Sequence, residues 1–285
     1  MKFVVLLRYN VAIRNQFGKH ALTWKIGRET DFESYCNSLF APDRLAAHEN
    51  LLLQLALPSL VGQSRHLDDR DFRLQIYTST LLPDDHRNRL DEATEPYDWI
   101  EVIDVDPDGS PDFSGNIRRF LLDTKPAENS GWETFATIRL DDDDGLCRTY
   151  LDDLSDFVKP EYSGMCVSFA KGYMANYEPH AAKLCNFIEC NYFKNAQGLA
   201  HINAFNYDTG ELRHTPATVF DLGNHLMVDQ LVPVICDARK HSYLRVFHTG
   251  SDSYKTKHNE AAYKDAKSIP LAQLRQDVDV SEDLV

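Results

Sequence analysis

Four consecutive aspartates, Asp141 to Asp144, are the residues of this chain with the clearest potential for chemistry. We call them the Asp run. They follow directly on the segment 134–140, which reads as a short, largely apolar β-strand. Side chains alternate along an extended chain, so Asp141 and Asp143 are expected on one side and Asp142 and Asp144 on the other. Like charges about 4 Å apart repel by about 4 kcal/mol near a protein surface. The run therefore predicts a bound divalent cation with oxygen ligands.

Two simpler explanations of the Asp run are a solvated acidic turn and a cap for the helix expected at Cys147–Phe157. A carboxylate at a helix N-terminus gains about 0.3–1 kcal/mol from the helix dipole. One cap needs one aspartate, so three would remain unexplained. A calcium loop of the EF-hand kind fits poorly, because placing Gly145 at its sixth position puts Leu140, not an acid, at the first.

His248 is the best further metal ligand among the 11 histidines. It follows directly on a segment expected to be a strand and precedes Gly250 by two residues. Imidazole joins carboxylates readily around Mn²⁺ and similar metals. We therefore expect His248 and the Asp run to meet at one edge of a sheet.

The elements that must position these residues alternate between strand and helix patterns. Strands are expected at Lys2–Leu7, Phe72–Thr78, Trp99–Val105, Thr134–Leu140, Cys166–Phe169, Leu199–Phe205 and Tyr243–Phe247, and helices at Arg44–Leu57, Asp84–Leu90, Ile117–Leu122 and Leu146–Phe157. Asp43 is expected to cap the first helix and Leu57–Leu60 to end it in a turn, while Thr215–Val232 reads as a loop that leads into a helix. This alternation predicts an α/β fold with a mostly parallel central sheet flanked by helices.

The chain shows no linker that would separate two folded units. One domain over residues 1–260 is expected, followed by a polar, acidic tail over 261–285 with a frayed end. The weakly periodic segment 11–42 is expected to be a long loop.

Composition excludes several classes of function. The net charge of −14 argues against a nucleic-acid partner, because phosphate binding needs clustered Lys and Arg. No apolar run approaches the roughly 20 residues that cross a bilayer, and Arg8 interrupts the first apolar run before it could serve as a signal-peptide core. The six cysteines contain no CxxC pair and are expected to be reduced thiols. A cytoplasmic location is expected.

Several motifs of the chain resemble the rhamnosyltransferase family of bacterial glycosyltransferases. In chain order they are Arg8-Tyr9-Asn10, Leu57-Pro58-Ser59-Leu60 with Gln63, Asp71-Phe72-Arg73-Leu74 with Leu82-Pro83, and Arg139-Leu140 before the Asp run. The last motif is the most specific. The resemblance implies a single glycosyltransferase A-type domain that binds a nucleotide sugar, with an Asp-x-Asp motif at the end of a central strand.

The resemblance also implies roles within the Asp run. Carried over by position, Asp143 binds Mn²⁺ or Mg²⁺ with Asp144 in support, and Asp141 contacts the ribose or sugar of the donor. The register of the motif is open by one residue in a run of four. Asp142 therefore joins Arg139 and Asp141 as a candidate nucleotide-sugar-binding residue.

A late motif in related enzymes, His-x-x-Gly-x-x-Lys, implies a further metal ligand. His248 matches it in part, because Gly250 lies one place too early and Lys255 lies beyond it.

Other residues are candidates for binding the donor or for proton transfer. Arg8 and Lys171, at the ends of expected strands, could place positive charge on the diphosphate, and Tyr9 could stack on the donor base. An inverting transfer needs a carboxylate base near the acceptor hydroxyl. Asp229, on an expected helix between apolar residues, is the first candidate, and Asp221 is the second.

The expected function is a metal-dependent glycosyltransferase of surface polysaccharide synthesis. It would move a sugar, with rhamnose suggested by the family, from a nucleotide-diphosphate donor to a glycan or lipid-linked acceptor. One alternative is a phosphoryl-transfer or hydrolytic enzyme whose two-metal site adds Asp104 and Asp106 to the Asp run. The other is a non-enzymatic acidic interaction module in which the Asp run is solvated.

Overall fold

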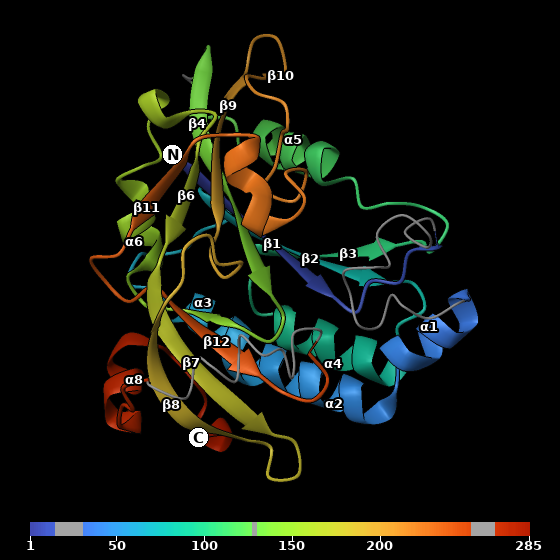
Figure 1. The fold of residues 1–285 in the computed structure, drawn as a ribbon. Helices are drawn as coiled ribbons and strands as arrows, with labels where there is room; N and C mark the ends of the chain where they lie inside the picture. Colours follow the sequence, from blue (N-terminus) through green and yellow to red (C-terminus); the bar gives the residue numbers. More distant parts are fainter. Residues whose placement is uncertain (15–30, 127–129, 252–265) are drawn as a thin grey trace.

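The computed structural model describes residues 1–14, 31–126, 130–251 and 266–285. Within these ranges, an eight-stranded sheet has the order β11-β6-β9-β4-β1-β2-β3, with β10 paired to β9 (Figure 1). Its strands are β1 (Lys2–Tyr9), β2 (Phe72–Ser79), β3 (Ile100–Val105), β4 (Trp132–Asp141), β6 (Cys166–Phe169), β9 (Ala200–Asn206), β10 (Glu211–Leu212) and β11 (Val234–Asp237).

The strands β3, β2, β1 and β4 form a parallel run, and it confirms the α/β prediction. β1 is almost wholly buried, as expected for a strand covered on both faces. Its parallel pairing with β4 sets Arg8 opposite Asp141. β9 continues the sheet beyond β4 in the antiparallel direction. The Asp run thus begins at the carboxyl end of a central strand, which is where α/β sheets bind ligands.

A second sheet, in the order β5-β12-β7-β8, was not expected from the sequence. It contains β5 (Gly145–Leu146), β12 (Tyr243–Phe247), β7 (Lys171–Glu178) and β8 (Lys183–Asn191). β5 follows the Asp run at once and pairs with β12. The hairpin β7–β8 escaped prediction because its side chains mix polar and aromatic types and its register shifts between Met174 and Asn176, which blurs the period of two.

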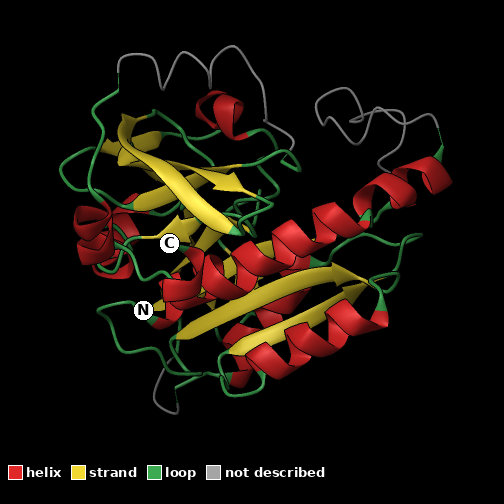
Figure 2. Cartoon of the chain, turned by 90° about the horizontal axis from the view of Figure 1, so that it is seen from below, coloured by secondary structure: helices red, strands yellow, loops and turns green. Residues whose placement is uncertain are grey.

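Helices cover both faces of the large sheet. Their bounds are α1 (Phe32–Leu39), α2 (Pro42–Leu51), η3 (Leu52–Ala56), α3 (Leu57–Val61), α4 (Asp84–Thr94), α5 (Phe113–Asp123), α6 (Tyr150–Ser155), η4 (Pro160–Tyr162), η5 (His225–Gln230), α8 (Leu271–Asp277) and η6 (Glu282–Leu284). α2, α3, α4 and α6 pack on one face, and α5 with the segment before η5 packs on the other (Figures 1 and 2). None of these helices combines the length and the hydrophobicity that a bilayer crossing requires.

The helix after α1 differs from its prediction at both ends. It begins at Pro42, with Ala41 at the cap position, so Asp43 lies in the first turn and is not the cap. The expected turn at 57–60 is wrong, because α2 continues through the π-helical turn η3 into α3. Pro58 lacks the N–H that would bond Gln54, and the Gln54 carbonyl accepts instead from the backbone of Ser281 at 3.0 Å. Likewise, the helix expected at 146–157 is shortened to α6.

The C-terminal segment is folded and not frayed. Leu274, Val278 and Leu284 have no exposed surface and share a core cluster with Leu51 and Leu55 of the long helix. Their burial overrides the polar composition of the tail. The proposed boundary at residue 260 lies outside the described residues, as does part of the expected loop at 11–42.

Candidate active site

The end of β4 brings two arginines to the first residue of the Asp run. Arg139 donates from Nη2 to both carboxylate oxygens of Asp141, at 3.2 and 3.0 Å. Burial alone would raise the pKa of Asp141, but the charges of Arg139 and Arg8 outweigh it, so the pKa lies below its ordinary value. Both guanidinium groups also lie over the Phe220 ring, at 5.6 and 4.6 Å from its centroid. Asp141 is therefore an ionised acceptor beside positive charge.

The remaining aspartates leave the strand and diverge. β4 ends at Asp141, and the chain turns so that the Asp144 N–H lies 3.3 Å from the Asp141 carbonyl. The alternation expected of an extended chain therefore stops at Asp141. Asp142 faces α2, whereas Asp143 and Asp144 face β12 and the residue that follows it.

Asp142 faces helix α2, where it meets His48. The Nδ1 atom of His48 lies 2.9 Å from Oδ1 of Asp142, and the two side chains are only 6% and 9% exposed. Burial alone would lower the pKa of His48, but the Asp142 carboxylate reverses that effect and raises it. Nε2 of His48 is buried and has no hydrogen-bond partner among the described residues. This nitrogen is therefore available to a ligand.

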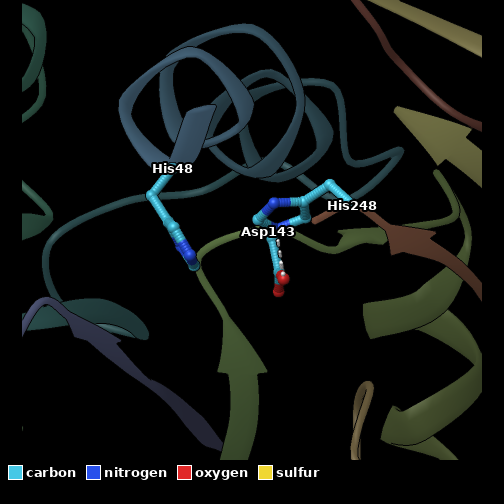
Figure 3. Close-up of side chains that lie close together, drawn as sticks. All are labelled: His48, Asp143 and His248. Atoms are coloured by element: carbon cyan, nitrogen blue, oxygen red, sulfur yellow. Dashed lines mark hydrogen bonds and ion pairs between the residues drawn. The ribbon is translucent and has the colours of Figure 1, made fainter. Parts of the chain in front are cut away.

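Asp143 faces His248, which follows β12. Nε2 of His248 lies 3.1 Å from Oδ2 of Asp143. Burial opposes ionisation of Asp143, but this hydrogen bond and the nearby imidazoles hold its pKa below the ordinary value. One ligand atom each from His48, Asp143 and His248 lie within 4.8 Å of one another (Figure 3). Two imidazole nitrogens and a carboxylate oxygen form a donor set that fits a divalent transition metal.

Asp144 anchors the turn to the second sheet. Its carboxyl group accepts from Nε2 of Gln197 at 2.6 Å and from the backbone of Val246 at 2.9 Å. Burial and the charges of Asp143 and Asp141 raise its pKa well above the ordinary value. The group of three metal-binding candidates does not include it. The group thus contains His48 where Asp144 was expected, and Asp144 holds β12 against the Asp run.

The sequence of the chain matches a model of the family described as "Putative rhamnosyl transferase" over residues 13–260. The chain belongs to this family. The match confirms the family that the motifs predicted. No curated protein matches the chain significantly.

Two similar solved structures are of TarS from S. aureus. TarS 1-349 has 13% identity and a TM-score of 0.39, and the match covers 86% of this chain and 60% of that one. The same protein in complex with UDP has 11% identity and a TM-score of 0.39, with 87% and 61% covered. The present chain therefore spans less than two thirds of those structures.

Two of the residues predicted to bind the donor are not positioned as the prediction required. Tyr9 has no exposed surface and packs in the core, so it has no ring face to offer a base. The backbone of Lys171 accepts from Ser242 before β12, whereas His248 follows the other end of that strand, roughly 20 Å along it. Lys171 therefore lies near the opposite end of β12 from the pair of His248 and Asp143.

The predicted base Asp229 lies on η5 and is about half exposed (49%). Its carboxylate pairs with Nζ of Lys194 at 2.8 Å, and this bond lowers its pKa. The runner-up, Asp221, accepts from the backbone of Thr218. Lys255, from the partial late motif, lies outside the described residues.

The acids of the two-metal alternative also lie apart from the Asp run. Asp104 pairs with Arg87, and Asp106 accepts from the backbone of Asp108. β3, which carries Asp104, is three strands from β4, or roughly 14 Å, whereas paired catalytic metals lie about 4 Å apart. The described residues contain no second cluster of ligands to complete such a site.

Sequence reasoning missed His48, although a signal was present. In α2 it lies three residues after Leu45 and four before Leu52, so it falls on the apolar face of the helix. A titratable residue in that position needs a buried partner. The missing information was that the partner is Asp142.

Proposed function

We propose that this chain is a glycosyltransferase that depends on a divalent metal held by His48, Asp143 and His248 and uses a nucleotide-diphosphate sugar as donor. The observation that supports this most is the convergence of these three side chains beside the Arg139–Asp141 pair at one strand end. Rhamnose is the transferred sugar that the family description suggests.

The proposed metal is Mn²⁺ in preference to Mg²⁺. Imidazole ligands suit transition metals, whereas Mg²⁺ prefers oxygen ligands and retains its waters. When bound, the cation would neutralise charge that develops on the diphosphate leaving group. His48 and His248 come from different elements of the fold, so the complete site requires the folded chain.

Arg8, Arg139 and Asp141 are proposed to bind the donor. The two guanidinium groups supply positive charge for a diphosphate in a chain whose net charge is −14. The ionised carboxylate of Asp141 can accept hydrogen bonds from ribose or sugar hydroxyls. These roles match those expected from the family resemblance.

Two residues of η5 are candidates for the general base. Asp229 remains the sequence candidate, although its ion pair with Lys194 weakens it as a base. His225 is the second candidate, because it begins η5 five residues after Phe220, whose ring lies under Arg8 and Arg139. Burial and nearby cations lower the pKa of His225 to about 4, so the imidazole is neutral at pH 7 but is also a weakened base.

Titration with nucleoside diphosphates and Mn²⁺ tests the proposal. We expect micromolar binding that requires the metal and that His48→Ala or Asp143→Ala removes. Asp123→Ala, which changes an exposed acid on α5, is the matched control and should bind like the wild type. Binding that does not need a metal, or no binding across the common nucleotides, would contradict the proposal.

A further inference from the structure

The metal-binding candidates lie on one face of the large sheet, and the cations proposed above to bind the donor lie on the other. His48 belongs to α2, which covers one face, and His248 follows β12 beside it (Figure 3). Arg8 and Arg139 instead lie over the ring of Phe220, which packs with α5 on the opposite face. An anion that binds the metal therefore needs a cation on the α2 face.

Arg44 is a cation on that face, and it belongs to the same cluster as the metal-binding candidates. It precedes His48 by one turn of α2, so the two side chains share a face of the helix. The rings of His48 and His248 are 4.8 Å apart. A Cβ atom added to Gly250 would lie 3.2 Å from the His248 ring and 3.3 Å from Cγ of Arg44. The bare backbone of Gly250 thus lies against both side chains, which fixes Arg44 beside His248.

Only one nitrogen of the Arg44 guanidinium is used within the protein. Nη1 donates to Oδ1 of Asn10, the residue after β1, and to the carbonyl of Leu39, the last residue of α1, at 3.1 Å. Both acceptors are neutral. Nε is buried without a hydrogen-bond partner, and no carboxylate pairs with Arg44 anywhere in the described ranges. Because buried charges are normally paired, the edge of the guanidinium formed by Nε and Nη2 suits an anion from outside the chain.

Asn10 orients this guanidinium without cancelling its charge. Its side chain is buried, and its backbone φ of 51° lies in the left-handed region, which asparagine adopts more readily than most residues. An aspartate in its place would have nearly the same shape but would form an ion pair with Arg44. The neutral amide therefore leaves the positive charge of Arg44 available to a ligand.

On the basis of the proposed function, we propose that Arg44 binds the diphosphate of the donor on the face where the metal binds, and that Asn10 positions it. A planar guanidinium offers two parallel N–H groups to an oxyanion. The Nε and Nη2 edge can therefore donate to the same phosphate group that the metal holds. Arg139 already pairs with Asp141, whereas Arg44 has no carboxylate partner in the described part of the chain.

Calorimetric titration with inorganic pyrophosphate and with nucleoside diphosphates, each in the presence of Mn²⁺, tests this contact. Arg44→Gln should weaken the binding of both probes by about 10- to 100-fold, as expected for lost hydrogen bonds to a charged group. Asn10→Asp should weaken it similarly, although the guanidinium is still present. Arg118→Gln is the matched control, because Arg118 is also partly buried and donates to a backbone carbonyl, that of Gly210. It should bind both probes like the wild type.

The affinity for Mn²⁺ alone separates a ligand contact from a structural role. A cation repels a metal ion beside it, so Arg44→Gln should bind Mn²⁺ at least as tightly as the wild type. Parallel loss of Mn²⁺ and pyrophosphate binding would show that Arg44 only supports the metal site, and this would overturn the proposal. Unchanged pyrophosphate binding in Arg44→Gln would overturn it too. Thermal melting without ligand checks folding, and if Arg44→Gln is unfolded, Asn10→Asp decides the question.

The two probes also separate this proposal from the proposed function. Nucleoside diphosphate binding that Arg44→Gln leaves unchanged overturns only the Arg44 contact. Pyrophosphate binding that depends on Arg44, without binding of any nucleotide, supports the contact and overturns the nucleotide-sugar donor. Binding of neither probe to the wild type overturns both.

Discussion

At the scale of single residues, we propose that Asp142 acts on the metal through His48. If Nδ1 of His48 is protonated and donates a hydrogen bond to Asp142, Nε2 keeps its lone pair. This lone pair points away from Asp142 and is free for a cation. A carboxylate that fixes the tautomer and orientation of a ligating imidazole is a common support for a metal site. Asp142 is then a positioning residue and not a contact for the donor.

Removing this support should weaken the metal site without removing a ligand. We expect Asp142→Ala to lower Mn²⁺ affinity by about 10- to 100-fold in calorimetric titration. Asp142→Asn keeps an acceptor oxygen for His48 and should lose less. If Asp142→Ala binds Mn²⁺ like the wild type, His48 does not depend on this carboxylate.

The sequence predicted the place of the site better than the roles within it. Alternation along a strand placed Asp141 with Asp143 and Asp142 with Asp144. That reasoning required the strand to continue, whereas β4 ends at Asp141. His48 and Asp142 are 94 residues apart, so only the packing of α2 against the turn could reveal their contact.

At the scale of elements, the parallel strands were predictable and the irregular ones were not. β1, β2 and β3 have continuous or alternating apolar patterns, and each lies within two residues of its expected bounds. The long helix α2–η3–α3 was cut short in the prediction because Pro58 usually ends a helix. Its continuation depends on a partner for the Gln54 carbonyl that comes from Ser281, far along the chain.

β9 carries a buried histidine that makes stability depend on pH. His201 has no exposed surface, and burial together with the nearby His214 lowers its pKa to about 4. In the unfolded chain its pKa is about 6.5. Between these values the unfolded state binds a proton that the folded state does not. The free energy of unfolding should therefore fall as pH drops below 6.5, by about 2.5 kcal/mol at pH 4.5.

Urea unfolding at pH 7 and pH 4.5 measures this contribution. His201→Gln should remove that part of the pH dependence, because glutamine does not titrate. His66→Gln changes an exposed histidine and should leave the dependence unchanged. The same slope in the wild type and in His201→Gln would assign the effect to other groups.

At the scale of the whole molecule, the C-terminal segment supports the helix that carries His48. The sequence suggested a polar tail because few of its residues are apolar, yet Leu274, Val278 and Leu284 are fully buried. They share a cluster with residues of α2, η3 and β12. The mean composition of the tail hides these few apolar residues. Only their contacts show that the C-terminal segment stabilises the site.

Truncating one of these side chains should therefore destabilise the entire fold. We expect Leu274→Ala to lower the free energy of unfolding by about 2–5 kcal/mol, because it leaves a cavity beside α2 and η3. Leu122→Ala, at a half-exposed position on α5, should change it by less than about 0.5 kcal/mol. Denaturant unfolding measures both values.

A nucleoside diphosphate with Mn²⁺ should still raise the melting temperature of Leu274→Ala, since the ligands of the metal are intact and binding favours the folded state. Equal stability of the two variants would show that the C-terminal segment is not part of the cooperative core.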